Sequence, residues 1–204
     1  KNYNKKIEGF GTGLKPPTEE EWEELRKELL TVEKLEYADA RQQELAASYD
    51  NSTSIYFPPV GNQGSSGSCV SFCFGYYTKT YQEARERGWD LSGASWVSTP
   101  SPGYVATAYQ DKIFSPDFIY HLINNGIDNG SYYTDNGKVL SYYGICSWSR
   151  KPTNDTEYTS FPSELAWREA PLNRTASNAI YVTFTTDSNL TTLKTILSNN
   201  NLAV

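Results

Sequence analysis

The sequence predicts an α+β fold in which helices come first and strands follow only near the C-terminal end. Apolar residues recur at helical spacing between residues 18 and 143, whereas a strand-like run, IYVTFT, occupies 180–185. Hydrophobic residues make up 38% of the 204 residues and charged residues 21%, so the chain can bury a core. Helical segments followed by strands are the order expected of an α+β protein.

The first helix is expected over residues 18–34. Thr18 and Glu21 match the capping box, and the acidic residues between them suit the positive N-terminal end of a helix. Residues 1–17 precede it as a loop. Residues 36–58 follow it as an extended connector that ends in prolines.

A second helix is expected from Cys69 to Arg87, with Gly88 as its C-cap. The glycine- and serine-rich loop 61–68 leads directly into it. Residues 92–114 are rich in Ser, Pro and Gly, and we expect a surface insertion there.

The remaining elements are shorter. Ser115 and Pro116 predict the start of a helix that ends at Gly126, since Ser is a favoured N-cap and Pro is favoured at the first helical position. The next helix is expected over 133–143, and Gly144 predicts its end. Further helices are expected over 163–168 and 188–199, and a strand is expected to begin at 202–204.

Charge and composition limit the function. The net charge is −6 without a long basic run, which argues against nucleic acid or an anionic membrane as the partner. No apolar stretch approaches the roughly 18 residues of a membrane span. The three cysteines form neither a disulfide framework nor a C-x-x-C zinc motif, and the acidic residues of 128–135 miss the calcium-loop spacing. We therefore expect no cofactor and no metal.

Cys69 and Gln63 are the candidate catalytic residues. A helix N-terminus favours a thiolate, because its unpaired N–H groups and its dipole stabilise an anion, and Cys69 lies where the helix should begin. The side-chain amide of Gln63, six residues upstream across a glycine-containing loop, can supply a second oxyanion donor beside the Cys69 N–H.

The segment from Phe57 to Cys69 resembles the nucleophile region of papain-like (cathepsin-like) cysteine peptidases, whose pattern is N-Q-G-x-x-G-S-C followed by a helix. The resemblance implies a helical left domain followed by the beginning of a right β-barrel domain. It also implies that Cys69 is the nucleophile and Gln63 part of the oxyanion hole. Substrate-binding residues implied by it are Gly67, Ser68, Gly130, Ser131 and Tyr132.

The sequence departs from the family at two positions. Ser66 replaces a cysteine that in the family bridges to another just before an N-G-G motif, and that partner is also missing from the matching segment Asp128–Tyr132. Val70 replaces an aromatic residue. In its missing bridge, its insertion at 92–114 and its lack of further cysteines, the sequence resembles the archaeal or bacterial members of the family.

The resemblance implies three parts, namely a pro-segment or N-terminal extension (1–45), the helical left domain (46–177) and the start of the right domain (178–204). The implied function is a cysteine endopeptidase, as a proenzyme or a cleaved N-terminal chain, acting on proteins or peptides. Its catalytic His and Asn or Asp would lie in a C-terminal fragment of the same precursor, beyond Val204. Because the chain starts at Lys1 and has no Met, it is expected to be a processed product. The protein is expected to be secreted. Five glycosylation sequons accompany this expectation, at Asn51, Asn129, Asn154, Asn173 and Asn189.

One alternative function stays open at this point. The chain could be a non-catalytic papain-like homologue that uses its cleft as a binding or adhesion module. Cys73 and Cys146 are expected to be structural thiols. His121, the only histidine, is not expected to be the general base, because it lies off the apolar face of its helix, where an exposed or capping histidine is the simpler account.

Overall fold

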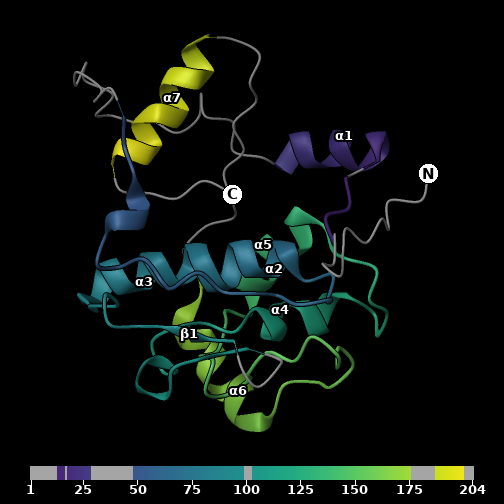
Figure 1. Cartoon of the computed structure of the whole chain (residues 1–204). Coiled ribbons are helices and arrows are strands. Elements are labelled where there is room, and N and C mark those ends of the chain that lie inside the picture. Colours follow the sequence, from purple (N-terminus) through teal and green to yellow (C-terminus); the bar gives the residue numbers. More distant parts are fainter. Residues whose placement is uncertain (1–12, 17, 29–47, 99–102, 176–186, 200–204) are drawn as a thin grey trace. The chain divides into compact units, whose positions relative to one another are not determined.

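The structure is a computed structural model that describes residues 13–16, 18–28, 48–98, 103–175 and 187–199 (Figure 1). It divides into two compact units: residues 1–16 with 54–178, and residues 17–53 with 179–204. Both predicted domain boundaries, at 45/46 and 177/178, lie outside the described residues. The division into 1–45, 46–177 and 178–204 therefore stays a prediction.

A single helical rod dominates the first unit (Figure 1). It consists of α2 (Cys69–Ser71), the π-helical η3 (Phe72–Lys79) and α3 (Thr80–Arg87). The rod ends at Gly88, which adopts a left-handed conformation at φ 65° and donates its N–H to carbonyls of the last turn. The helix and cap predicted here are confirmed. The wider π-type winding in the middle was not predicted.

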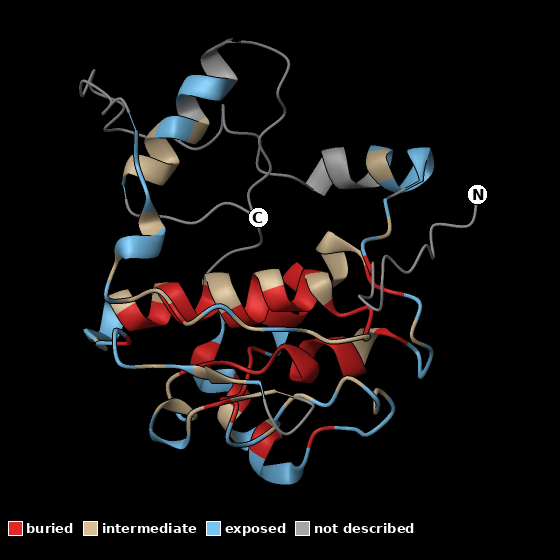
Figure 2. Cartoon of the chain, in the orientation of Figure 1, coloured by how far each residue is buried: buried red, intermediate tan, exposed pale blue. Residues whose placement is uncertain are grey.

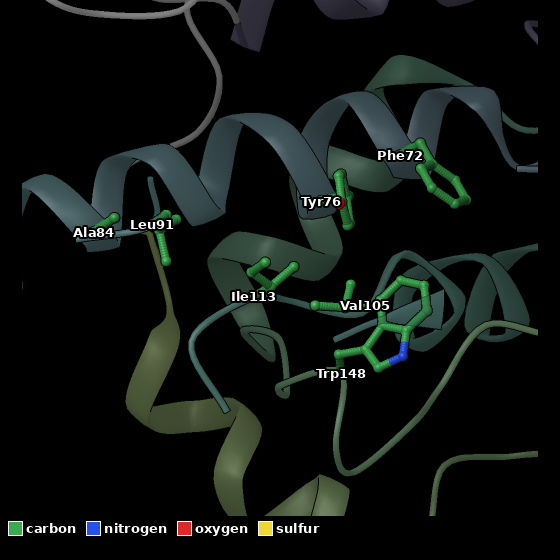
Figure 3. Packing of buried hydrophobic residues seen from close by; sticks show 7 residues of the cluster. All are labelled: Phe72, Tyr76, Ala84, Leu91, Val105, Ile113 and Trp148. Atoms are coloured by element: carbon green, nitrogen blue, oxygen red, sulfur yellow. The ribbon is translucent and has the colours of Figure 1, made fainter. Parts of the chain in front are cut away.

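The core of this unit lies against one face of the rod (Figures 2 and 3). Tyr76 and Trp148 are fully buried, and their ring centroids lie 5.9 Å apart at a steep angle. Trp96 packs edge-on against Trp148 at 5.3 Å. The cluster of buried residues comprises Phe72, Tyr76, Ala84, Leu91, Val105, Ile113 and Trp148.

Part of the segment 92–114 belongs to this core, which the expectation of a surface insertion did not foresee. Its hairpin pairs β1 (Trp96–Val97) antiparallel with β2 (Tyr104–Val105). Val105 and Ile113 are both 0% exposed. Burial of these two apolar side chains against the rod is favourable in free energy, and it holds this part of the segment in the core although the segment as a whole is polar.

Three shorter helices complete the unit: α4 (Pro116–Ile123), α5 (Tyr133–Tyr142) and α6 (Glu164–Glu169). The predicted cap of α4 is confirmed, because the Ser115 Oγ accepts a hydrogen bond from the Phe118 N–H at 3.1 Å. Gly75 on η3 allows α4 to approach closely, since a Cβ there would lie 3.0 Å from Ile119.

The second unit contains α1 (Glu19–Glu28), the 3-10 turn η2 (Asn51–Thr53) and α7 (Asp187–Ser198). The capping box at α1 is confirmed: the Thr18 N–H donates to the Glu21 carboxylate at 2.7 Å, and the Glu21 N–H donates to the Thr18 Oγ at 3.2 Å. The strands expected at 180–185 and 202–204 lie outside the described residues, as does the end of the first predicted helix.

The described residues thus form an α+β structure of helices with one small two-stranded sheet. The right β-barrel domain stays a prediction. Within the described ranges, no helix has the length and apolarity needed to cross a bilayer.

Candidate active site

Cys69 is the first residue of the rod and so stands at a helix N-terminus, where the first backbone N–H groups have no intrahelical partner. The rod begins there because the Phe72 N–H donates to the carbonyl of Ser68, the N-cap residue, at 2.9 Å. Cys69 is half-buried. A half-exposed thiol at a helix N-terminus is the environment that favours a reactive thiolate.

The Cys69 sulfur accepts a hydrogen bond from the backbone N–H of Gly13 at 3.3 Å. These two residues are 56 positions apart in the chain. A segment preceding the first helix therefore reaches the candidate nucleophile.

The loop before Cys69 is held by its own glutamine. The Gln63 Nε2 donates to the Ser66 carbonyl at 2.8 Å, which closes the loop on itself. This bond takes one of the two N–H groups of the amide. The structure thus places the Gln63 amide within the loop that ends at Cys69, and its oxyanion role stays a prediction.

Two aspartates from distant segments also hold this loop. Asp128 accepts the Gly67 N–H on Oδ1 at 2.7 Å, and Asp155 accepts the Ser65 N–H on Oδ2 at 3.1 Å. Asp155 lies against Gly64, where a Cβ would come within 2.0 Å of its carboxylate. The sequence analysis missed both roles. The hydrogen bonds span 61 and 90 residues, and no local pattern signals contacts at such distances.

Residues 13–15 lie between residues 67–69 and the predicted substrate-binding segment 130–132. We call the space that they fill the groove, and these two segments its walls. The Ser131 N–H donates to the Gly13 carbonyl at 2.7 Å, and the Lys15 N–H donates to the Ser131 carbonyl at 3.1 Å. These bonds form a parallel bridge between Leu14 and Ser131. The Lys15 ammonium lies 5.6 Å from the Tyr132 ring centroid.

Gly13 fits this groove without space for a side chain. A Cβ on Gly13 would lie 1.7 Å from the Gly67 carbonyl oxygen, and a Cβ on Gly130 would lie 1.9 Å from the Gly13 oxygen. The structure therefore brings Gly67, Cys69, Gly130 and Ser131 together around one backbone segment. Ser68 is buried and its Oγ has no hydrogen-bond partner, so any contact of Ser68 with a ligand would use its backbone.

Asn136 links the rod to this wall. It is 0% exposed, and its Oδ1 accepts from the Ser71 Oγ at 2.6 Å. Its Nδ2 donates to the Ser131 Oγ at 3.0 Å and to the Tyr132 carbonyl at 2.7 Å. A fully buried amide with such partners fixes the position of the wall relative to the helix that carries Cys69. The sequence gives no signal for it beyond a polar residue in a helix.

The other two cysteines differ from Cys69 in environment. Burial raises the pKa of the Cys73 thiol, and the nearby Cys69 raises it further. Burial also raises the pKa of the Cys146 thiol, and Cys146 is 0% exposed. Both groups are therefore protonated at neutral pH, as fits the structural roles predicted for them.

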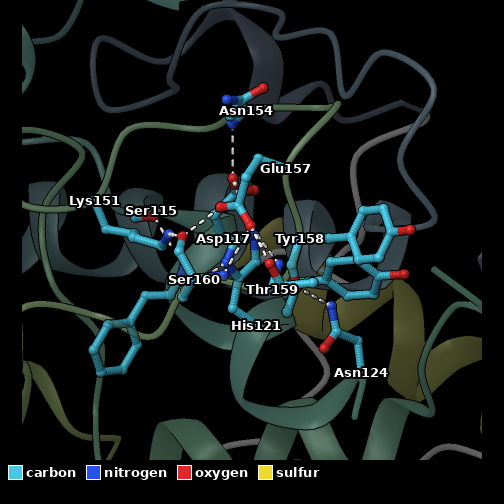
Figure 4. Close-up of polar contacts among 12 residues, drawn as sticks. Ser115, Asp117, His121, Asn124, Lys151, Asn154, Glu157, Tyr158, Thr159 and Ser160 are labelled. Atoms are coloured by element: carbon cyan, nitrogen blue, oxygen red, sulfur yellow. Dashed lines mark hydrogen bonds and ion pairs between the residues drawn. The ribbon is translucent and has the colours of Figure 1, made fainter. Parts of the chain in front are cut away.

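His121 is buried, so the expectation of an exposed or capping histidine is wrong. Its polar contacts are drawn in Figure 4. Its Nδ1 lies 2.8 Å from the Ser160 carbonyl, and its Nε2 lies 3.5 Å from the Asp117 Oδ2. Burial raises the pKa of the Asp117 carboxyl, and the hydrogen bond from His121 opposes this shift. Hydrogen bonding to the loop around Ser160 explains why the side chain points inward although it is off the apolar face. Both ring nitrogens face partners other than Cys69.

Among the residues that the structure describes, no group of three or more His, Cys, Asp or Glu side chains is placed to hold a metal ion. The candidate site therefore consists of a thiol, backbone N–H groups and amides. Such groups can stabilise a tetrahedral oxyanion and pair with an extended peptide.

Comparisons with known proteins support the fold. No family model matches the sequence, and no curated protein matches it. Among solved structures, the chain is similar to xylellain, a cysteine protease from Xylella fastidiosa, with a TM-score of 0.60 and 17% sequence identity. The match covers 96% of this chain and 65% of xylellain, so the chain spans about two thirds of that protein's length. This similarity shows a papain-like fold.

Proposed function

We propose that this chain is the nucleophile-bearing part of a papain-like cysteine endopeptidase in an inhibited form. The observation that carries the proposal is the backbone of Gly13, which bonds to both the Cys69 sulfur and the Ser131 N–H. The groove thus holds an extended polypeptide against a thiol at a helix N-terminus. A peptide substrate needs the same surroundings.

In the proposed reaction, the Cys69 thiolate attacks the carbonyl carbon of a peptide bond. The oxyanion that forms accepts hydrogen bonds from the Cys69 N–H and the Gln63 amide. Collapse of the intermediate breaks the C–N bond, and the leaving amine takes a proton from a histidine. Water then hydrolyses the thioester and regenerates the thiol.

His121 does not fit the role of proton carrier, because its nitrogens face Asp117 and Ser160. We therefore propose that the catalytic histidine and its Asn or Asp partner are supplied by a segment outside this chain, on the right β-barrel domain. The chain spans only 65% of xylellain, which is consistent with a partner fragment of this kind. Protein or peptide substrates, a secreted location and an archaeal or bacterial branch of the family are part of the same proposal.

Residues 1–45 are proposed to act as a pro-segment. Residues 13–15 of this segment pair with Ser131 and contact the Cys69 sulfur, where they would exclude a substrate. The pairing with Ser131 is parallel, and the fit at Gly13 is close. Activation would then require this segment to leave or to be cleaved.

The test is labelling of the thiols by a peptidyl epoxide, located by mass spectrometry, over a range of pH. The labelled protein carries Gly13→Ala, which is expected to open the groove. The Cys69→Ser variant is the control for labelling at the other two cysteines. Rapid, pH-dependent labelling of Cys69 but not Cys73 supports the peptidase. The labelling is done with the histidine-bearing C-terminal segment present. If Cys69 then reacts no faster than a thiol in the urea-unfolded chain, the peptidase proposal is wrong and the binding-module alternative gains support.

A further inference from the structure

Asp128 joins the two walls of the groove through a single carboxylate oxygen. Its Oδ1 accepts the Gly67 N–H at 2.7 Å and the Tyr120 hydroxyl at 2.6 Å. Gly67 belongs to the loop that ends at Cys69, whereas Asp128 stands two residues before Gly130 on the opposite wall. The carboxylate therefore lies where the two walls meet.

Tyr120 extends this connection to the wall itself. Its hydroxyl donates to Asp128 and accepts the Gly130 N–H at 3.2 Å. Tyr120 is 0% exposed on α4, and burial together with the Asp128 carboxylate raises the pKa of its hydroxyl. The hydroxyl is therefore protonated at neutral pH and can donate to Asp128.

Both residues that this network holds contact the occupant of the groove. The Gly67 carbonyl and the Gly130 backbone each lie close to Gly13, as the absence of space for a Cβ shows. A shift of Gly67 would also move Cys69, which lies two residues further along the chain. The relative position of the thiol and the peptide-pairing wall therefore depends on one charged hydrogen-bond acceptor.

We propose that Asp128 is a positioning residue that aligns the Cys69 loop with the Gly130–Ser131 wall, through Gly67 on one side and Tyr120 on the other. Its catalytic consequence rests on the peptidase proposal, whereas its effect on the two glycine amides does not. An ionised acceptor binds an N–H more strongly than a neutral one, so a carboxylate suits this place better than an amide.

The experiment compares Asp128→Ala, Asp128→Asn and Tyr120→Phe in the full chain. Asp90→Ala is the matched control, because Asp90 is also a carboxylate that accepts a backbone N–H, that of Ser92, but at an exposed turn. The first measurement is hydrogen exchange at the Gly67 and Gly130 amides, resolved by NMR. We expect exchange to accelerate about 10- to 100-fold in Asp128→Ala at both amides, in Tyr120→Phe chiefly at Gly130, and less in Asp128→Asn, which keeps an oxygen acceptor.

The second measurement is the ratio of the Cys69 labelling rate with a peptidyl epoxide to that with iodoacetamide, in the Gly13→Ala background. Iodoacetamide needs only a reactive thiol, whereas the peptidyl reagent also needs the aligned wall. We expect the ratio to fall about tenfold in Asp128→Ala, to recover in part in Asp128→Asn, and to stay unchanged in Asp90→Ala.

The outcomes separate the two proposals. If the amides of Asp128→Ala exchange as in the unmodified chain, the positioning role is wrong, whatever the labelling shows. An unchanged labelling ratio beside accelerated exchange overturns the alignment of thiol and wall. If Cys69 is unreactive in the Gly13→Ala parent even with the histidine-bearing segment present, while exchange at Gly67 still depends on Asp128, the peptidase proposal fails and the linkage of the two walls stands.

Discussion

The backbone N–H of Gly13 points at the Cys69 sulfur from 3.3 Å, while the carbonyl of the same residue accepts the Ser131 N–H from 2.7 Å. The peptide group before the Gly13 Cα thus bonds to the candidate nucleophile, and the peptide group after it bonds to the opposite wall. The absence of a side chain at this position makes that approach possible.

Gly13→Ala is expected to open the groove. Its Cβ would collide with the Gly67 carbonyl at 1.7 Å, a backbone atom that cannot rotate away, so the segment must move. The Cys69 alkylation rate should rise about tenfold or more, as judged by mass spectrometry with iodoacetamide. Leu14→Ala is the control, since Leu14 is 43% exposed and its backbone pairing with Ser131 does not need the side chain. An unchanged rate in Gly13→Ala would show that the segment does not shield the thiol.

Asn136→Ala is expected to lower the free energy of unfolding by about 1–3 kcal/mol, because the buried hydroxyls of Ser71 and Ser131 lose their amide partner. Urea denaturation followed by tryptophan fluorescence measures the change. The control is Ser141→Ala on the same helix, whose Oγ bonds only to the Lys138 carbonyl and which should change stability by less than about 0.5 kcal/mol. Equal effects of the two substitutions would contradict the linking role of Asn136.

Glu83→Gln tests a buried ion pair on the rod. The Lys79 and Glu83 side chains are only 5% and 6% exposed, and Arg87 also contacts Glu83. Loss of the carboxylate leaves the Lys79 ammonium buried without its counter-ion, and unfolding should become about 3 kcal/mol easier in urea.

The matched control for Glu83→Gln is Glu164→Gln. That residue also forms an i, i+4 pair, with Arg168, but the two side chains are 76% and 73% exposed. The expected change in the free energy of unfolding is at most about 1 kcal/mol. If Glu83→Gln lowers the free energy of unfolding by no more than Glu164→Gln does, water must reach the buried pair.

Glu157 is expected to contribute to acid sensitivity. Hydrogen bonds from Ser160 and Thr159 lower the pKa of its carboxyl from 4.5 to about 2. A lowered pKa in the folded state adds stability above pH 4.5, and this stability is lost as the pH falls toward 2. Glu157→Gln should therefore flatten the stability curve between these pH values in thermal melts. The effect will be modest because the carboxyl is largely solvated.

The Glu157→Gln control is Asp111→Asn, at another exposed carboxylate that accepts a serine hydroxyl. It should leave the slope of stability against pH almost unchanged, since that carboxylate accepts a single hydroxyl, whereas Glu157 accepts hydrogen bonds from both Thr159 and Ser160. A curve for Glu157→Gln that parallels the unmodified protein would show that the turn of residues 157–160 contributes no proton linkage.

The local elements were predictable because local chemistry specifies them. The capping box at Thr18, the N-cap at Ser115 and the left-handed Gly88 all involve partners within four residues. The start of a helix at Cys69 was expected from the glycine- and serine-rich loop before it, although the Ser68 side chain makes no capping hydrogen bond. The burial of His121 was not predictable, because its partner Ser160 lies 39 residues away, on a loop whose path no local pattern describes.

The sequence by itself determined where the described helices begin, and that a thiol stands at the start of the rod. Only the tertiary structure decided which backbone lies against that thiol, which aspartates hold its loop, and that the segment around Val105 is core. The physical reason is range. Caps and periodicity act within a turn or two, whereas the contacts of Cys69 with Gly13 and of Gly67 with Asp128 span 56 and 61 residues and exist only after the chain has packed.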